Sequence, residues 1–493
     1  MSWAHIQALR DRLDLERGPA FTPGPRRVVM LYPSPYRVGM SSLGYQWICG
    51  VLADQGFAVE RAFLPDDVDA WRRSRTPLLT VETQSPVSGF PVVGVSLAYE
   101  LELAGLITAL ELAGIPPLRA ARGPEHPRVI VGGPLTFSNP RPAAPFADLL
   151  LLGEAEETVG PAMEAALGGP GWLDACAALP GAYLPERDGA RLPPIAKATD
   201  TLLPARSRWV TPDTELSNMF LLEGERGCHR QCTFCVMRRS TNGGMRLVTP
   251  ERVLSLVPEH APRVGLVGAA ISDHPRLPEL LEALVTAGKG VGISSLRADR
   301  VARKPQIARL LREGGYSTLT VASDAASQRL RRTIAKGTTE QHLLDCAKLA
   351  AEHRYRLLKV YMMLGVPGET DADVDELARF TRELAAIHPV ALGIAPFVPK
   401  VNTPLDGAGF AGKAVVEARL KRLQQALRKE RGRVDIRATS ARWAWVEAVL
   451  AQGGPEAGEA VLAAVRAGGR FADYRRAFRE GATEAVKRLE RAA

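Results

Sequence analysis

Three cysteines lie within eight consecutive residues near the middle of this chain. They are Cys228, Cys232 and Cys235 of the segment Glu225-Arg-Gly-Cys-His-Arg-Gln-Cys-Thr-Phe-Cys. Three thiolates spaced Cys-x3-Cys-x2-Cys on one loop can hold three corners of a cubane 4Fe–4S cluster. A fourth cysteine is missing nearby, so one iron would stay open for a substrate or cofactor. The spacing therefore predicts a cluster that does chemistry.

A zinc site or a chance grouping accounts less well for these cysteines. A structural zinc ion needs four closed ligands, usually in pairs, and His229 is expected to face another direction in so tight a loop. Three unrelated core cysteines would not be expected to carry Arg and Gln between them. The remaining cysteines, Cys49, Cys176 and Cys346, are far apart along the chain and are not expected to bind the cluster.

The cysteine segment resembles the signature of the radical S-adenosylmethionine (radical SAM) superfamily, including the aromatic Phe234 before the last cysteine. The resemblance implies that the methionine part of SAM chelates the open iron through its amino and carboxylate groups. It also implies an electron donor such as flavodoxin or ferredoxin, reductive cleavage of SAM, and a 5′-deoxyadenosyl radical that abstracts hydrogen from a substrate. The cofactors would carry this chemistry, while the protein orients them and excludes water.

The same resemblance implies SAM contacts at the ends of later strands. The residues expected to bind SAM are Phe234, Gly268, Ala269, Ser294, Ser295, Arg297, Asp324 and Leu364. Two departures from the superfamily stand out. The Gly-Gly-Glu-like turn reads Gly268-Ala-Ala270 and lacks the Glu, and Ser323-Asp324 replaces a frequent Pro-Glu.

The elements around the cysteines predict a barrel. Between residues 216 and 404, six short apolar strands alternate with helical stretches. This pattern suits a partial (β/α)6 barrel, in which the chemistry lies at the carboxyl ends of the strands. Residues 405–493 are expected to be a helical C-terminal region. There basic residues surround an apolar stripe of Val416, Leu420, Leu423 and Leu427, which is interpreted as a packing stripe with a solvated face rather than an RNA-binding surface.

A second α/β region precedes the barrel. Residues 1–25 form a lead, residues 26–168 alternate five apolar strands with helices, and residues 169–215 form a connector rich in Pro and Gly. Buried strands alternating with helices predict a doubly wound, Rossmann-type parallel sheet.

A doubly wound domain before such a barrel resembles the cobalamin-binding class of radical SAM enzymes. The resemblance rests on Ser96-Leu97, Gly132-Gly133 and Gly153-Glu-Ala-Glu156 at strand ends. It implies cobalamin contacts from Tyr36, Gly39, Ser96, Leu97, Gly132, Gly133 and Glu154. The turn after the first strand lacks the histidine that often binds cobalt in this class, and the domain's His126 lies in a Pro-rich loop. Cobalamin is therefore expected without a histidine ligand, the alternative being a domain that no longer binds it.

The composition is that of an ordinary multidomain soluble protein. The chain has 493 residues, 24% of them charged, and a net charge of +9. The positive charge permits RNA binding but is better explained by an Arg-rich composition spread along the chain. The charged N-terminus is unlike a signal peptide, and no apolar run approaches the roughly 18 residues of a membrane span. A cytoplasmic location is expected.

These features predict a radical SAM enzyme that transfers a methyl group from cobalamin to an unactivated carbon. One alternative is methylthiotransferase-like modification of tRNA or protein, which the barrel also resembles. Those enzymes carry three further cysteines in the N-terminal domain, where this chain has only Cys49, with Cys176 in the connector. A non-catalytic, cluster-bearing binding module is a second alternative. Nothing in the sequence identifies the substrate.

Overall fold

The computed structural model describes residues 2–237 and 244–491, which form two compact units. Unit 1 comprises the chain up to Phe220 together with Gly453–Ala485. Unit 2 comprises Leu221–Gln452 together with the chain from Val486 onward. Each unit has its own sheets and core.

Unit 1 is built on a six-stranded sheet in the order β2-β1-β3-β4-β5-β6. Its strands are β1 (Arg27–Tyr32), β2 (Ala58–Phe63), β3 (Val92–Ser96), β4 (Arg128–Gly132), β5 (Leu149–Leu151) and β6 (Ala182–Tyr183). The first five are parallel, and β6 is antiparallel to β5. The order 2-1-3-4-5 is one of the two common doubly wound arrangements, so the predicted α/β fold is confirmed.

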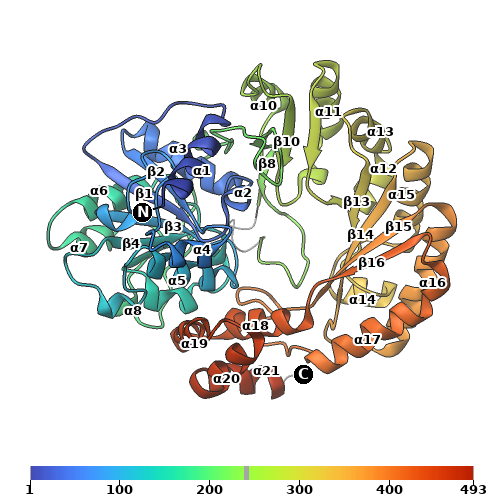
Figure 1. Cartoon of the computed structure of the whole chain (residues 1–493). Coiled ribbons are helices and arrows are strands. Elements are labelled where there is room, and N and C mark those ends of the chain that lie inside the picture. Colours follow the sequence, from blue (N-terminus) through green and yellow to red (C-terminus); the bar gives the residue numbers. More distant parts are fainter. Residues whose placement is uncertain (1, 238–243, 492–493) are drawn as a thin grey trace. The chain divides into compact units, whose positions relative to one another are not determined.

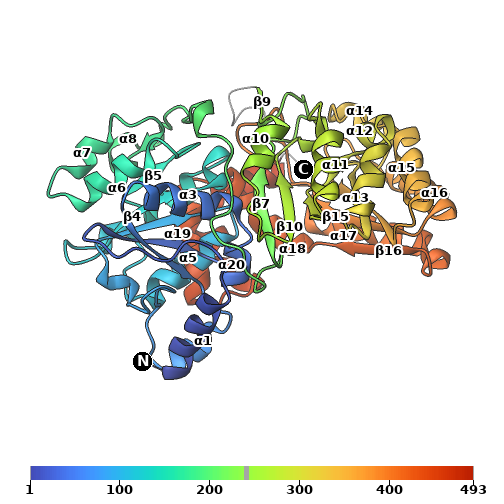
Figure 2. The same ribbon diagram turned by 90° about the horizontal axis from the view of Figure 1, so that it is seen from above.

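Helices cover both faces of this sheet (Figure 2). Helices α3 (Leu43–Asp54) and α6 (Val159–Leu167) lie on one face, and α5 (Glu102–Leu112) and α19 (Pro455–Arg466) on the other. The remaining helices of the unit are α1 (Trp3–Asp14), α2 (Tyr36–Gly39), α4 (Val68–Arg73), α7 (Trp172–Cys176), α8 (Pro185–Asp188) and α20 (Phe471–Gly481). Because both faces are covered, β1 is almost wholly buried and reads as a continuous apolar run.

The C-terminal region is divided between the units. Residues 453–485 belong to unit 1, where α19 packs against α5 and the 3-10 helix Arg141–Phe146. Asn139 Nδ2 donates to the Gly453 carbonyl over 2.7 Å, and Arg466 Nε forms an ion pair with Glu111 Oε1 at 2.9 Å. The expectation of a single helical region over 405–493 therefore differs from the observed division.

Unit 2 is a partial barrel. Its main strands are β7 (Met219–Glu223), β10 (Arg263–Val267), β11 (Gly290–Ile293), β12 (Leu296–Arg297), β13 (Thr318–Ala322), β14 (Leu357–Leu364), β15 (Val390–Pro396) and β16 (Val434–Ala438). They form one sheet in the order β11-β10-β7 and another in the order β12-β13-β14-β15-β16. Within each sheet these strands are paired in chain order, as in a barrel, and the six predicted strands are all present.

Two details of the barrel differ from the expectation. The predicted strand around residue 294 is split into β11 and β12 by the exposed Ser294 and Ser295. Strand β16 lies in the region expected to be helical and pairs in parallel with β15. Its burial alternates from buried Val434 to exposed Asp435 and Arg437, which is a strand pattern too short to be recognised in a helical context.

Helices cover the outer side of the barrel strands (Figure 1). These are α11 (Leu277–Thr286), α12 (Ala298–Arg303), α13 (Gln306–Glu313), α15 (Glu340–Glu352), α16 (Asp371–Ile387) and α17 (Lys413–Ala426). Also present are α10 (Pro250–Ser255), α14 (Gln328–Thr333), α18 (Ala441–Gln452) and α21 (Thr483–Arg491). No helix within the described residues is both long and apolar enough to cross a bilayer.

Candidate functional site

The three clustered cysteines lie in the loop that follows the first barrel strand. Strand β8 (Glu225–Gly227) continues from β7, pairs with β9 (Met245–Leu247), and ends directly before Cys228. Gly227 has a φ of 93°, which lets the chain turn sharply into the loop. The predicted cluster residues thus lie at the carboxyl end of a barrel strand, the edge where barrel enzymes carry their chemistry.

The six cysteines fall into two groups by burial. Cys228, Cys232 and Cys235 are partly accessible, whereas Cys49, Cys176 and Cys346 are fully buried. Burial raises the pKa of the Cys49 thiol to about 12, so this sulfur stays protonated and is a poor metal ligand.

The loop cysteines differ from these in being partly accessible. Burial raises the thiol pKa of Cys228 and Cys235 as well, but the amide of Arg230 donates to Cys228 Sγ over 3.4 Å and opposes that shift. Among the described residues, no three His, Cys, Asp or Glu side chains are arranged around a single ion. A cubane cluster needs only one sulfur at each iron corner.

An ion-pair network holds the cysteine loop in place. Arg230, between the first two cysteines, donates from Nε and Nη2 to the two carboxylate oxygens of Asp273 over 2.7 and 2.5 Å. Asp273 follows β10, its side chain is fully buried, and Arg300 of α12 also donates to it. Burial opposes ionisation of Asp273, but these hydrogen bonds outweigh it and hold its pKa at about 2. Asp273 is therefore ionised at neutral pH and holds the cysteine loop through Arg230.

The side chain of Glu225, from β8, reaches the turn Gly268-Ala-Ala270, which lacks the Glu expected from the superfamily. This side chain is fully buried, and its Oε1 accepts the amide of Ala270 over 2.6 Å. Any side chain at Gly268 would collide with the same carboxylate, so the glycine is required there. Burial raises the pKa of Glu225 to about 7, and its Oε2 is buried without a hydrogen-bond partner among the described residues.

A second loop joins the predicted SAM residues to the cysteines. The amide of Thr233 donates to the Ile334 carbonyl over 3.1 Å, and Arg297 Nη2 donates to the Lys336 carbonyl over 2.9 Å. The Lys336 ammonium pairs with Asp324, which has a φ of 62°. Residues 334–336 therefore link Arg297, Asp324 and the cysteine loop.

The other residues expected to bind SAM are placed as follows. Phe234 and Gly268 are half-buried, whereas Ala269, Ser294 and Ser295 are exposed. Leu364 is buried at the end of β14. Arg297 is itself buried and ion-paired to Asp299 at 3.0 Å, so its guanidinium already has a partner within the protein.

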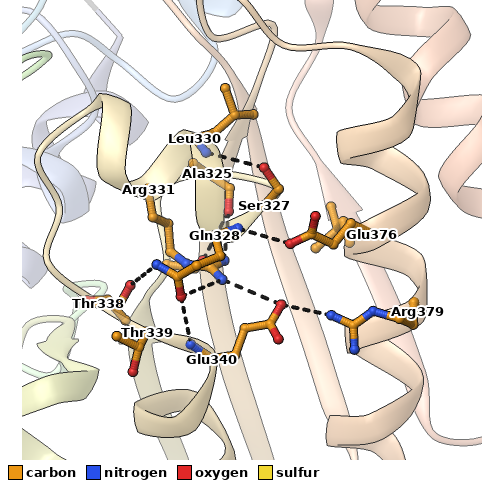
Figure 3. Close-up of polar contacts among 12 residues, drawn as sticks. Ala325, Ser327, Gln328, Leu330, Arg331, Thr338, Thr339, Glu340, Glu376 and Arg379 are labelled. Atoms are coloured by element: carbon orange, nitrogen blue, oxygen red, sulfur yellow. Dashed lines mark hydrogen bonds and ion pairs between the residues drawn. The ribbon is translucent and has the colours of Figure 1, made fainter.

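Below Asp324 lies a buried arginine that sequence patterns did not single out. Arg331 Nη1 donates to Ser323 Oγ over 3.1 Å and to the Ala325 carbonyl over 3.4 Å. Figure 3 shows this guanidinium between Ala325, Gln328 and Glu340, with Arg379 on the far side of Glu340. The network fixes the turn after β13 from beneath.

In unit 1, four of the residues expected to bind cobalamin come together at the carboxyl ends of β3 and β4. Ser96 is in register with Gly132, the amide of Leu97 donates to the Gly132 carbonyl, and the amide of Leu135 donates to the Leu97 carbonyl. A methyl group at Gly132 would meet only the Leu151 carbonyl oxygen, at 3.7 Å. The backbone of Gly132 is therefore open to a ligand.

Gly133 has a backbone conformation that only glycine adopts readily. Its φ of 101° and ψ of 177° lie in a region essentially reserved for glycine. A methyl group there would lie 2.6 Å from the Leu97 carbonyl oxygen. The glycine is required by packing within the unit, whether or not a ligand is bound.

The remaining residues expected to bind cobalamin are engaged in packing. Tyr36 is buried and donates to Glu16 Oε1 over 2.5 Å, while a side chain at Gly39 would collide with Phe63. Glu154 is buried, and its Oε2 accepts the amide of Ala198 over 2.9 Å. These contacts hold the three residues within the packed interior of unit 1.

The switch point of the sheet, between β1 and β3, is tied together by Glu102. Its two carboxylate oxygens accept the Ser34 hydroxyl at 3.1 Å and the Ala98 amide at 2.6 Å. These partners belong to the loops after β1 and β3, respectively. A ligand of a doubly wound sheet binds outside such strand ends, so Glu102 fixes the edges of that position.

Both α/β regions match protein-family models. Residues 44–185 match the N-terminal model for radical SAM proteins, and residues 224–381 match the radical SAM superfamily model. The uncharacterized protein MJ0966 of Methanocaldococcus jannaschii is 26% identical over 83% of this chain and 85% of its own. A probable dual-specificity RNA methyltransferase RlmN of Gemmatimonas aurantiaca is 27% identical over 44% of this chain and 62% of its own.

Two solved structures share the fold. The radical SAM methyltransferase TsrM of Kitasatospora setae, solved with cobalamin and a 4Fe–4S cluster, aligns with a TM-score of 0.54 at 15% identity over 77% of this chain and 74% of its own. The cobalamin-dependent enzyme OxsB with aqua-cobalamin aligns with a TM-score of 0.50 at 14% identity over 82% of this chain and 61% of its own. The superfamily implies SAM and a 4Fe–4S cluster as cofactors. Residues 224–381 are thus a radical SAM domain, residues 44–185 correspond to the N-terminal region of radical SAM proteins, and the chain is a radical SAM enzyme.

Proposed function

We propose that this enzyme is a cobalamin-dependent methyltransferase that acts on an unactivated carbon. The observation that carries the proposal is the open backbone of Gly132 beside Ser96, at the strand ends of a 2-1-3-4-5 sheet. Ligands of such sheets bind outside the carboxyl ends of the strands. TsrM and OxsB, whose folds resemble this one, were solved with cobalamin bound.

The residues of unit 1 fit cobalamin without a histidine on cobalt. His126 precedes β4 and so lies at the amino edge of the sheet, opposite the strand ends that carry Ser96 and Gly132. Ser96 is half-exposed and offers a hydroxyl to a nucleotide tail, while Gly132 leaves room for that tail against the backbone.

In unit 2, Cys228, Cys232 and Cys235 would hold the cluster, and the turn fixed by Glu225 would lie beside SAM. When bound, the cluster and SAM supply a 5′-deoxyadenosyl radical after one electron arrives from a flavodoxin- or ferredoxin-type donor. The protein's own part is to keep the cysteine loop anchored through Arg230 and Asp273, and to hold Asp324 and Arg297 through Lys336.

The alternative is methylthiotransferase-like modification of tRNA or protein. Such enzymes use three cysteines of the N-terminal domain for a second cluster. In unit 1 the cysteines are Cys49 and Cys176, two where such a cluster takes three, and both are fully buried. This burial favours the methyltransferase over the methylthiotransferase.

Anaerobic reconstitution of the full chain with iron, sulfide and hydroxocobalamin tests the proposal. We expect 5′-deoxyadenosine from SAM, iron bound per chain, and the visible spectrum of base-off cobalamin that His126→Ala leaves unchanged. Cys232→Ala should lose iron, whereas the matched buried control Cys346→Ala should keep it; the reverse result would overturn the ligand assignment. A chain that cleaves SAM but binds no cobalamin has no methyl carrier, and a chain that binds iron but not SAM is a non-catalytic module.

A further inference from the structure

One face of the second barrel sheet carries an exposed tyrosine in the middle of a strand. Along β14 burial alternates, and Leu358, Val360, Met362 and Leu364 are buried on the side covered by helices. Lys359, Tyr361 and Met363 project from the opposite side of the sheet. Tyr361 is 39% exposed, which is unusual for an aromatic side chain at the centre of a parallel sheet.

The neighbouring strands leave room above this face. Tyr361 is in register with Ala322 of β13 and Gly393 of β15, and Lys359 is in register with Thr320 and Ala391. A methyl group at Gly393 would lie 2.7 Å from Cδ1 and 2.9 Å from Cε1 of Tyr361. The tyrosine ring therefore rests on the bare backbone of Gly393, and part of its surface stays open.

The charge of this face is set by Lys359. The ammonium donates to Tyr361 Oη over 2.9 Å and lies 4.5 Å from the ring centroid. Lys359 has no ion pair within the part of the chain that the structure describes. The next charges on the face are already paired: Arg437 and Asp435 of β16 are hydrogen-bonded to each other at 2.6 Å, and Arg297 of β12 is ion-paired to Asp299 at 3.0 Å. One unneutralised cation thus stands beside an exposed aromatic ring.

The platform lies close to the residues described above. The Tyr361 carbonyl accepts the amides of Ser323 and Asp324 at 2.9 and 3.0 Å, so the ring projects at the level of the turn that carries Asp324. Residues on one face of a strand repeat every ~7 Å, so the Cα atoms of Lys359 and Tyr361 lie about that far apart, with Lys359 on the side away from the carboxyl ends of the strands. The Lys359 ammonium nevertheless reaches the Tyr361 hydroxyl, so the cation and the ring can contact one ligand together.

We infer that Lys359, Tyr361 and Gly393 form the substrate platform of this enzyme, and that the substrate is a small compound with a planar aromatic ring and an acidic group. The ring stacks on Tyr361 and the acid binds Lys359. This inference rests on the proposed function in one respect: the compound bound to the platform is the one on which the radical generated in unit 2 acts.

Three probe compounds distinguish recognition of the aromatic ring by Tyr361 from recognition of the acidic group by Lys359. They are 2-naphthoate, which has ring and acid, 2-naphthalenemethanol, which has the ring alone, and cyclohexanecarboxylate, which has the acid without a planar ring. Binding to the full, reconstituted chain is measured by calorimetry. We expect 2-naphthoate to bind about tenfold more tightly than either of the others, because charge-assisted hydrogen bonding and stacking each contribute.

The variants assign each half to its residue. Lys359→Met should weaken 2-naphthoate about tenfold and leave 2-naphthalenemethanol unchanged, whereas Tyr361→Leu should weaken both. Arg437→Met, which removes an exposed but already paired cation from the same face, is the matched control and should change neither. Both Lys359→Met and Tyr361→Leu alter accessible side chains, so the fold should survive, and circular dichroism checks this.

The outcomes distinguish the platform from the proposed methyl carrier. Equal affinity of all three probes, no binding of 2-naphthoate to iron-loaded protein, or an equal loss in Arg437→Met would each overturn the platform. The protein could also bind 2-naphthoate in a way that depends on Lys359 and yet take up no cobalamin. That result would support the platform and contradict the proposed cobalamin-dependent methyl transfer.

Discussion

Arg230 and Asp273 form a two-point hydrogen-bonded ion pair across 43 residues of sequence, and one of them lies inside the cysteine motif. Replacing Asp273 with Asn would leave Arg230 and Arg300 without their shared anion. Breaking a buried pair by removing one partner typically costs about 3–5 kcal/mol. We expect Asp273→Asn to lower the free energy of unfolding by roughly that amount and to reduce the iron bound per chain.

The control for this prediction is Glu251→Gln. Glu251 is an exposed carboxylate that pairs with Arg276 outside the cysteine loop, so its loss should leave both iron content and stability unchanged. Asp273→Asn that binds wild-type levels of iron with an unaltered electron paramagnetic resonance spectrum would show that the pair does not position the loop.

Glu225 should make stability depend on pH in the acid-to-neutral range. Its pKa is raised from 4.5 to about 7, so the folded chain holds a proton that the unfolded chain releases. Stability contributed by the protonated form is complete below about pH 4.5 and is lost as the pH rises through 7, by up to about 3 kcal/mol.

Glu225→Gln should remove this dependence, since the amide has no proton to lose. Denaturant unfolding at pH 5 and pH 8, compared between the two proteins, measures the difference. A wild-type pH profile that the variant reproduces would mean that Glu225 is ionised in the folded protein.

Substitution of Gly132 and of Gly133 should have different effects on the free energy of unfolding. Gly133→Ala forces a side chain into a glycine-only conformation and against the Leu97 backbone, and should destabilise the unit by at least about 1–3 kcal/mol. Gly132→Ala should be neutral for folding because its Cβ would make only an ordinary van der Waals contact, with the Leu151 carbonyl oxygen at 3.7 Å. If cobalamin lies on this edge, Gly132→Val lowers the cobalamin bound per chain without lowering Tm, and equal binding would place the cofactor elsewhere.

Arg331 should be a stability determinant of the barrel. Arg331→Met removes the donor to Ser323 and Ala325 and leaves buried acceptors behind, for which we expect a loss of about 2–4 kcal/mol. The adjacent Arg332 is exposed and serves as the control, since Arg332→Met should leave the melting temperature within a degree or so of wild type. Similar losses in both variants would argue against the network in Figure 3.

The features that sequence predicted well are local. The cysteine spacing and the alternation of apolar strands with helices lie within short segments, and the superfamily and the fold that they predict are confirmed. The residues that were missed act over distance. Asp273 belongs to no recognisable sequence motif. The role of Lys336 depends on its contacts with Asp324 and Arg297, which are distant from it in the sequence. The steric need for glycine at position 133 likewise comes from a neighbour in space, the Leu97 backbone, while its contact with a ligand stays a prediction.

The return of residues 453–485 to unit 1 makes that unit discontinuous in sequence. During synthesis, the partners of α5 and of the segment Arg141–Phe146 leave the ribosome only after every barrel strand has been made. Folding of the N-terminal unit therefore cannot be completed until residues 221–452 have been translated. Until then, the face of α5 that packs against α19 stays uncovered. A chain truncated by a premature stop after residue 452 would keep every cysteine and every barrel strand and still be a target for chaperones and proteases, because the core of its N-terminal unit stays open.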